Sequence, residues 1–162
     1  MTNIYFDFED GNGPVPAHQH PNGGGWVADT AKVYETSYVG PDAQVYGDAT
    51  VSGNARVSSN ATVSGNAWVY DDAWVSDDAR VYGNATVSGD ATVSGNARVY
   101  DDARVYDDAT VSGNAWVAGD AEVYGDARVY GDETEKELIG ILVKDRIFIN
   151  GKWYVEEVED DE

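Results

Sequence analysis

The sequence predicts an all-β protein in which one chain coils into a three-sided prism, with a short cap before the coils and a β-hairpin after them. A six-residue period runs from residue 25 to residue 132 as 18 hexads, without insertion or deletion. The consensus hexad is Ala-x-Val-x-Gly-Asn/Asp, and its third residue is Val in all 18 copies. Repeats of this kind are typical of solenoids, whose units complete one another's core by stacking.

Each hexad is expected to form a short strand followed by a corner. Ala and Val are two residues apart, so in an extended segment they point to the same side and their neighbours point outward. The last two positions are mostly Gly, Asn, Asp or Ser, which are turn residues that tolerate unusual backbone angles. With three hexads per turn, the repeat gives six coils, about 29 Å long at about 4.8 Å per strand.

Hexads such as AQVYGD, ATVSGN, ARVSSN and AWVYDD resemble the hexapeptide repeat of left-handed parallel β-helices. The resemblance implies a single-stranded left-handed parallel β-helix, and the left-handed sense comes from the resemblance alone. Residues 23–51 also resemble the openings of hexapeptide-repeat proteins from bacteria and tailed phages, which implies a phage-encoded chain. A fold does not fix a function, so these likenesses leave the activity open.

Three hexads per turn place every eighteenth residue in one outward column. Aromatic and arginine side chains, which are enriched at binding hot spots, gather on the first two faces of the prism. The candidate interaction surface consists of Tyr46, Arg80, Tyr82, Arg98, Tyr100 and Trp116 on the first face, Trp68, Tyr70, Arg104 and Tyr106 on the second, and Phe148 and Trp153 in the hairpin. These residues would contact another copy or a foreign partner. Alternatively, they are strand-favouring residues that cover their neighbours.

The formal net charge is -20, from 30 acidic and 10 basic residues. Such a charge excludes direct nucleic-acid binding through a basic face and disfavours anionic membranes. Most of the repeat's carboxylates lie at corners, including four Asp-Asp pairs. Their spacing matches no EF-hand loop, so solvated turn residues are expected rather than a calcium site. A rigid acidic prism could also imitate the charge of DNA.

The two ends depart from the repeat. Residues 1–24 are expected to form an N-terminal strand and loop cap, residues 25–132 the β-helix, and residues 133–162 a C-terminal element. In that element, residues 139–149 and 152–158 are predicted strands of a hairpin around Asn150-Gly151, followed by an acidic tail. The hairpin either caps the last coil or mediates oligomerisation.

Catalytic residues are not expected. The resemblance to acyl-CoA-dependent acyltransferases implies a catalytic His near a coil, a loop interrupting the repeat, and trimers. The repeat contains no His and no interruption, and the two histidines, His18 and His20, precede it in a Pro/Gly-rich loop where solvated or capping roles are expected. The following Gly23-Gly24-Gly25 is expected to be a flexible lead-in. The absence of Cys removes disulfides and thiolate metal sites.

These observations favour a non-enzymatic structural or interaction protein without a cofactor or metal. The expected partners are further copies of the chain, as a dimer or trimer, and a host or defence protein, for which the acidic prism would act as an inhibitor or DNA mimic. No apolar segment long enough for a membrane and no secretion signal is visible, so a cytoplasmic location is expected. The alternatives are an active or degenerate acyltransferase relative and a surface adhesin or fibre element.

Overall fold

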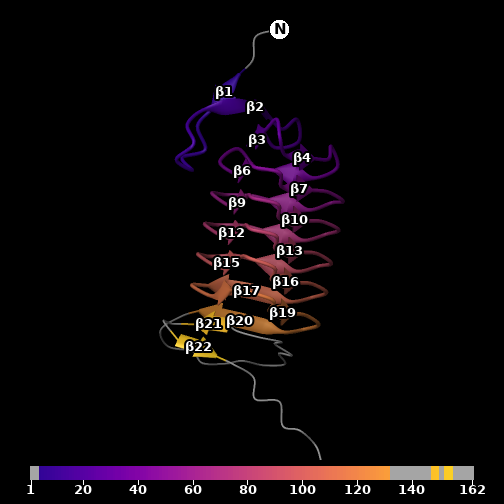
Figure 1. The fold of residues 1–162 in the computed structure, drawn as a ribbon. Helices are drawn as coiled ribbons and strands as arrows, with labels where there is room; N and C mark the ends of the chain where they lie inside the picture. The colour runs from indigo at the N-terminus through magenta and orange to yellow at the C-terminus, as the bar shows by residue number, and fades with distance from the viewer. Residues whose placement is uncertain (1–3, 132–146, 150–151, 155–162) are drawn as a thin grey trace, which may run out of the picture.

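The computed structural model describes residues 4–131, 147–149 and 152–154, and the side chains of residues 4–131. Within these ranges the protein is a β-solenoid whose short strands stack coil upon coil into three sheets (Figure 1). The all-β parallel fold of about six coils is therefore confirmed. None of the described residues forms a helix, and thus no helix capable of spanning a membrane is found among them.

Each sheet forms one face of the prism. The first face has ten strands in the order β1(Tyr5–Phe6), β2(Val15–Gln19), β3(Trp26–Ala28), β6(Gln44–Val45), β9(Thr62–Val63), β12(Arg80–Val81), β15(Arg98–Val99), β18(Trp116–Val117), β21(Ile147–Ile149) and β22(Lys152–Tyr154). The second face has six, β4(Lys32–Val33), β7(Thr50–Val51), β10(Trp68–Val69), β13(Thr86–Val87), β16(Arg104–Val105) and β19(Glu122–Val123). The third face also has six, β5(Tyr38–Val39), β8(Arg56–Val57), β11(Trp74–Val75), β14(Thr92–Val93), β17(Thr110–Gly113) and β20(Arg128–Gly131).

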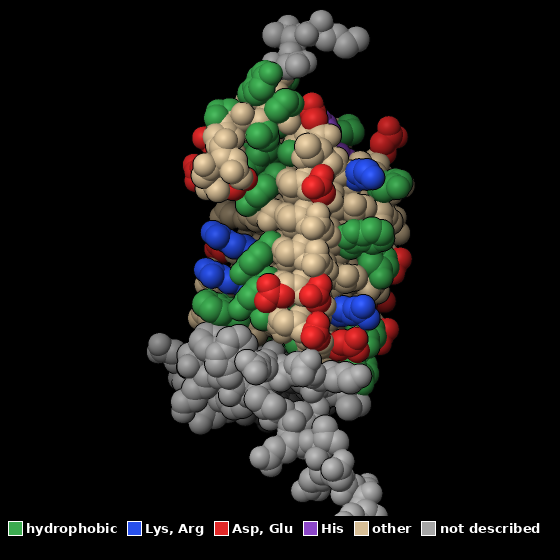
Figure 2. Space-filling view, in the orientation of Figure 1, with side chains coloured by type: hydrophobic (Ala, Val, Ile, Leu, Met, Phe, Trp, Pro, Cys, Tyr) green, Lys and Arg blue, Asp and Glu red, His purple; other side chains and the backbone are tan. Residues whose placement is uncertain are grey.

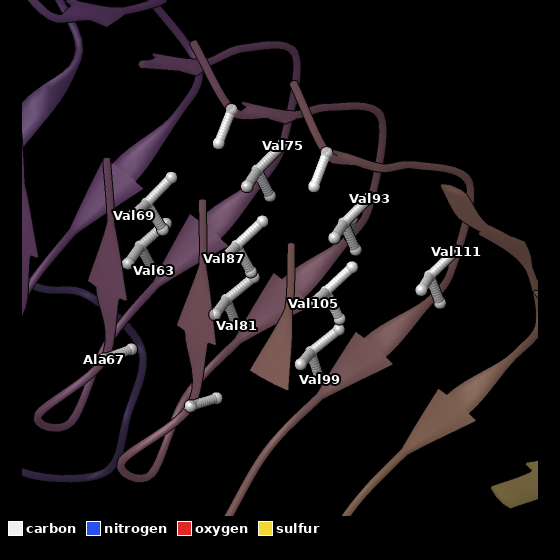
Figure 3. Close-up of a cluster of buried hydrophobic side chains, with 14 of the residues drawn as sticks. Val63, Ala67, Val69, Val75, Val81, Val87, Val93, Val99, Val105 and Val111 are labelled. Carbon is white, nitrogen blue, oxygen red and sulfur yellow. The ribbon is translucent and has the colours of Figure 1, made fainter. Parts of the chain in front are cut away.

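The register of the coils is fixed at eighteen residues. Val63 pairs with Val81, and Val81 pairs with Val99, in parallel strands of the first face. The other two faces follow the same register, so each Val lies over the Val of the neighbouring coil. Figure 3 shows these valines in columns that point into the prism. The predicted three hexads per coil are confirmed.

The core consists almost entirely of Ala and Val. Every repeat Val from Val39 to Val129 is 0% exposed, and the first-position alanines from Ala43 to Ala127 are at most 1% exposed. Small Ala next to branched Val fills a narrow interior that larger side chains would overfill. The core is less closed at its N-terminal end, where Ala31 and Val33 are only partly buried.

The corners depend on left-handed backbone at the fifth position of the hexad. Gly occupies most of these positions, but Asp71, Asp77, Asp101 and Asp107 adopt φ of 59–61° and Ser59 adopts 54°. Asp tolerates this conformation better than most residues because its short side chain can bond locally. The Asp77 Oδ2 accepts a hydrogen bond from the Gly95 N–H in the next coil at 3.1 Å.

The N-terminal segment folds onto the first face. Strand β1 pairs with β2, and β2 pairs with β3, both antiparallel. The Phe6 ring stacks on Trp26 with centroids 4.4 Å apart, and Phe8 contacts Tyr46 at 4.9 Å. The cap therefore covers outward side chains of the first face in addition to the edge of β3.

The Gly-rich run is held in place, so the expectation of a flexible lead-in is wrong. The Val39 N–H donates to the Asn22 carbonyl, and the Gly25 N–H donates to the Val39 carbonyl at 3.0 Å. A Cβ on Gly23 or Gly25 would overlap backbone oxygens of the first coil. These glycines let the chain lie directly over β5, where a side chain would not fit.

The C-terminal hairpin also joins the first face. Strand β21 pairs antiparallel with β18, and Phe148 lies opposite Trp116 in this pairing. Strand β22 pairs with β21, with Trp153 opposite Phe148. The predicted hairpin is confirmed for these six residues, and the remainder of the predicted strands lies outside the described residues. The N-terminal strands β1 and β2 and the C-terminal strands β21 and β22 thus extend the same sheet.

Candidate functional site

Six of the predicted interaction residues lie together on the first face. Tyr46, Arg80, Tyr82, Arg98, Tyr100 and Trp116 all lie on, or directly after, the strands β6, β12, β15 and β18 of one sheet. The Tyr82 and Tyr100 rings stack with centroids 5.0 Å apart. Tyr46 is less free than expected because the Phe8 ring packs against it. In Figure 2, cationic side chains lie next to hydrophobic ones over this part of the first face, at the left of the view.

A groove of about 440 Å³ lies on this face. Its floor lies at Thr62 and Ser64, two small residues between coils that carry larger side chains, and Phe8 closes it at the N-terminal end. The groove is lined by aromatic, amide, hydroxyl, acidic and cationic groups from Phe8, Glu9, Gln44, Tyr46, Asn60, Thr62, Ser64, Asp78, Arg80, Tyr82 and Arg98.

Two guanidinium groups border the groove on consecutive coils. Arg80 and Arg98 are paired neighbours in β12 and β15. The Arg98 guanidinium lies 4.8 Å from the centroid of the Trp116 ring, a cation–π arrangement. Among residues 4–131, neither arginine has a carboxylate within ion-pair distance. Partial burial, then the neighbouring Tyr100, raises the pKa of Tyr82 above its ordinary value, and Arg98 opposes that shift.

The second face carries a similar hollow with a different charge arrangement. This hollow, of about 470 Å³, lies over Thr86 and Ser88. The Arg104 guanidinium contacts the Glu122 carboxylate at 3.4 Å, and the Tyr106 hydroxyl donates to the same carboxylate at 3.4 Å. Burial and the Glu122 charge raise the pKa of Tyr106. The arginine of the second face is therefore neutralised within the protein.

Two tryptophans on adjacent faces project into solvent. Trp68 is 57% exposed and Trp74 is 48% exposed, and the Asp71-Asp72 corner lies between them. Trp68 stands between Thr50 and Thr86 of the adjoining coils, which are too small to cover its ring. The Trp74 Nε1–H donates to the Ser58 hydroxyl at 3.1 Å. Trp68 was among the predicted interaction residues, whereas Trp74 was not.

The remaining predicted residues are separated from the groove. Tyr70, Arg104 and Tyr106 line the hollow of the second face. The backbones of Phe148 and Trp153 are placed in the hairpin, and their side chains lie outside what the structure describes.

Some corner carboxylates accept hydrogen bonds from asparagine amides of neighbouring coils. Asn54 donates to Asp72, Asn60 to Asp78, and Asn84 to Asp102, at 3.0–3.1 Å. A carboxylate that accepts such a bond is stabilised without a cation. Within the described part of the chain, no group of three or more His, Asp or Glu side chains could hold a metal ion.

The two histidines lie at the N-terminal end, away from the groove. The His18 Nδ1 lies 2.9 Å from the Asp29 carboxylate, and both side chains are about half exposed. His20 is 3% exposed, so the solvated interpretation is wrong for it. The Asn22 N–H donates to the His20 Nδ1 at 3.3 Å, which corresponds to the alternative capping role.

The eighteen-residue spacing correctly predicted which arginines and tyrosines share a face, but it did not predict the groove between them. Thr62 and Ser64 could have been recognised as a gap between larger residues in the same columns. Phe8 and Glu9 carry no such signal, because their position depends on how the N-terminal loop folds back.

The chain was also compared with known proteins. The YdcK β-solenoid repeat model matches residues 43–59, 55–71, 79–95 and 103–119, and each match begins at the first Ala of a hexad and spans about one coil. No curated protein matches the chain. The repeat matches and the stacked coils together identify the chain as a repeat β-solenoid protein.

Proposed function

We propose that this protein is a non-enzymatic scaffold that acts through protein–protein contacts. The observation that carries the proposal is the exposed pair Trp68 and Trp74 on a regularly hydrogen-bonded coil. A tryptophan buries up to about 250 Å² in an interface, so covering the exposed half of each ring contributes about 3 kcal/mol at 25 cal/mol per Å². The Asp71-Asp72 corner between the rings favours a partner surface with basic side chains between two apolar patches.

The proposal is tested with a Trp68→Ala/Trp74→Ala double variant. Recovery of partners from the native host is quantified by affinity purification, and the mass of the purified protein in solution is measured alongside. The expected result is loss of a partner, or of a dimer or trimer, from the double variant. Tyr5→Ala is the matched control because Tyr5 is 58% exposed but lies on the N-terminal hairpin. Unchanged partners and unchanged mass in the double variant would contradict the proposal.

The kind of foreign partner we propose is a basic host or defence protein that handles nucleic acid. Asp72, Asp90, Asp108 and Asp126 form one corner column, one carboxylate per coil. At about 4.8 Å per coil, this spacing is of the order of the rise of about 3.4 Å along the helix axis per phosphate of one DNA strand. A complex of this kind should weaken with salt and compete with DNA. A partner that binds equally at low and high salt would exclude mimicry of DNA while leaving the scaffold role intact.

A relationship to the hexapeptide-repeat proteins of bacteria and tailed phages is part of the same proposal, supported by the six-residue Ala-x-Val period. Because acyltransferases occur among hexapeptide-repeat proteins, an acyltransferase relative is the one enzymatic candidate. The His18–Asp29 contact favours this candidate, since a carboxylate can orient an imidazole as a general base. Acetyl-CoA binding, and acyl transfer that is lost in His18→Ala, would support this candidate over the scaffold. Absence of acetyl-CoA binding would exclude it.

A further inference from the structure

The groove on the first face has a charge arrangement that recurs nowhere else among residues 4–131. The chain carries 30 acidic and 10 basic residues, yet Arg80 and Arg98 lie side by side without a carboxylate partner among residues 4–131. Unpaired arginines also occur elsewhere among these residues, at Arg56 and Arg128. Arg80 and Arg98 differ because they occupy paired positions of neighbouring strands, where two guanidinium groups can bind one oxyanion together. Arginine presents its N–H donors in a planar fork that matches carboxylate and phosphate oxygens.

The second face provides an internal comparison. Its hollow also lies over a Thr-x-Ser hexad and beside an arginine, but Glu122 neutralises that arginine. The same kind of hollow therefore occurs once beside an arginine paired with a carboxylate and once beside two arginines that have no carboxylate partner among residues 4–131. The arrangement of the first face does not follow from the repeat alone.

The other groups in the groove match the body of a hydroxylated ligand. Gln44 offers an amide, Thr62 and Ser64 offer hydroxyls, and Glu9 offers a carboxylate that accepts hydrogen bonds from hydroxyl groups. Asn60 and Asp78 are bonded to each other through one N–H and Oδ1, which leaves the second Asn60 N–H and the Asp78 Oδ2 for a ligand. Tyr46 and Tyr82 stand on the coils either side of Thr62 and Ser64 and supply apolar ring surface. A groove of about 440 Å³ is large enough for one sugar ring with its acidic substituent.

We propose that this groove binds an acidic sugar, with Arg80 and Arg98 holding its carboxylate or phosphate and the amide, hydroxyl and carboxylate side chains holding its ring hydroxyls. The Trp116 ring beneath Arg98 keeps that guanidinium in position. The site is independent of the proposed partner contact at Trp68 and Trp74, which lie on the other two faces.

The test is a titration of the full chain followed by NMR of the arginine Nε–H groups. The probes are glucose 6-phosphate and galacturonate, with glucose and inorganic phosphate as reference probes. The Arg80 and Arg98 signals should shift with the acidic sugars and not with glucose, whereas the Arg104 signal should stay in place. If only one acidic sugar binds, the proposal stands and the preferred group is identified as phosphate or carboxylate.

Variants distinguish ligand binding in the groove from nonspecific attraction of anions to any arginine. Arg80→Gln or Arg98→Gln should weaken binding about tenfold, the effect expected for losing a hydrogen bond to a charged group. Arg104→Gln, the matched control, should leave the affinity within about twofold. Gln44→Leu should weaken the acidic sugar but not inorganic phosphate. The proposal is overturned if no acidic sugar shifts Arg80 or Arg98, if inorganic phosphate binds as tightly as glucose 6-phosphate, or if Arg104→Gln has the same effect as Arg80→Gln.

Discussion

Replacing Gly65 tests how the corners hold the coils together. Gly65 adopts φ +66°, and a Cβ at this position would lie 2.9 Å from the Gly83 nitrogen and 3.0 Å from its oxygen in the next coil. The same oxygen accepts the Asn66 N–H at 2.7 Å, so moving it weakens a hydrogen bond between coils. Left-handed backbone costs Ala about 1–2 kcal/mol, and the close contact adds about 1 kcal/mol. We therefore expect Gly65→Ala to lower the free energy of unfolding by about 2–3 kcal/mol.

The informative comparison is Gly65→Asn, which introduces the same Cβ. Asn adopts left-handed backbone more readily than Ala, and its side-chain oxygen can accept the Gly83 N–H, as Asp77 does for Gly95. We expect Gly65→Asn to cost about 1 kcal/mol, since one hydrogen bond returns about that amount. Both variants lose the flexibility of Gly in the unfolded chain, so that contribution cancels.

The assay is guanidinium unfolding followed by far-UV circular dichroism. Coils contact only their neighbours, so the midpoints are compared directly and the slopes are checked for equality. Equal destabilisation by Ala and Asn, within about 0.5 kcal/mol, would refute the reasoning, because it would show that the Cβ contact alone sets the cost.

Three further predictions follow from the core, the tyrosine stack and the cap. Val87→Ala removes two methyl groups from a fully buried position and should lower the unfolding free energy by about 2 kcal/mol in the same guanidinium assay. Thr86→Ala, on the outward side of the same strand, is the control and should lower it by less. The pKa of Tyr82 is raised in the folded protein, so the folded state binds its proton more tightly, and the associated stability is present below pH 10 and lost as the pH rises through the folded pKa. Tyrosinate absorbance should accordingly show a late-titrating component that loses amplitude in Tyr82→Phe but persists, because the pKa values of Tyr100 and Tyr106 are also raised. An unchanged titration would contradict the burial explanation. Phe6→Ala removes the stack on Trp26 and should speed amide hydrogen exchange in β2 without affecting β12, and Tyr5→Ala, on the exposed side of β1, serves as the control.

The coils were predictable because each residue's environment repeats along the chain. The pairing of Arg80 with Arg98, and of Trp68 with Thr86, follows from the period and three hexads per turn. The left-handed corners were predictable in kind, since Gly and Asp at the fifth position favour them. At these positions the residue preferences of each hexad and the stacking of the coils favour the same structure.

The ends were predictable only in part, because their positions depend on contacts between segments without a repeat. Pro16 and His18 are weak strand formers, yet β2 forms because it pairs with the edge of β3. Phe8 reaches Tyr46 through a loop whose course no periodicity encodes. One side of the groove, formed by the arginine and tyrosine columns, was therefore predictable from the repeat. The other side, formed by Phe8 of the N-terminal loop, was not.

Because of the eighteen-residue register, the length of the coiled region can change only by whole coils if later residues are to keep their faces. Deleting one whole coil, such as residues 67–84, would return every later residue to its own face. Deleting a single hexad, such as residues 85–90, would leave each strand intact but turn everything after it by one face. Arg98 would then leave the sheet of Arg80, and the hairpin of β21 and β22 would no longer share a sheet with the N-terminal cap. Insertions and deletions in such a chain are therefore tolerated in steps of three hexads, even though the repeat itself is six residues long.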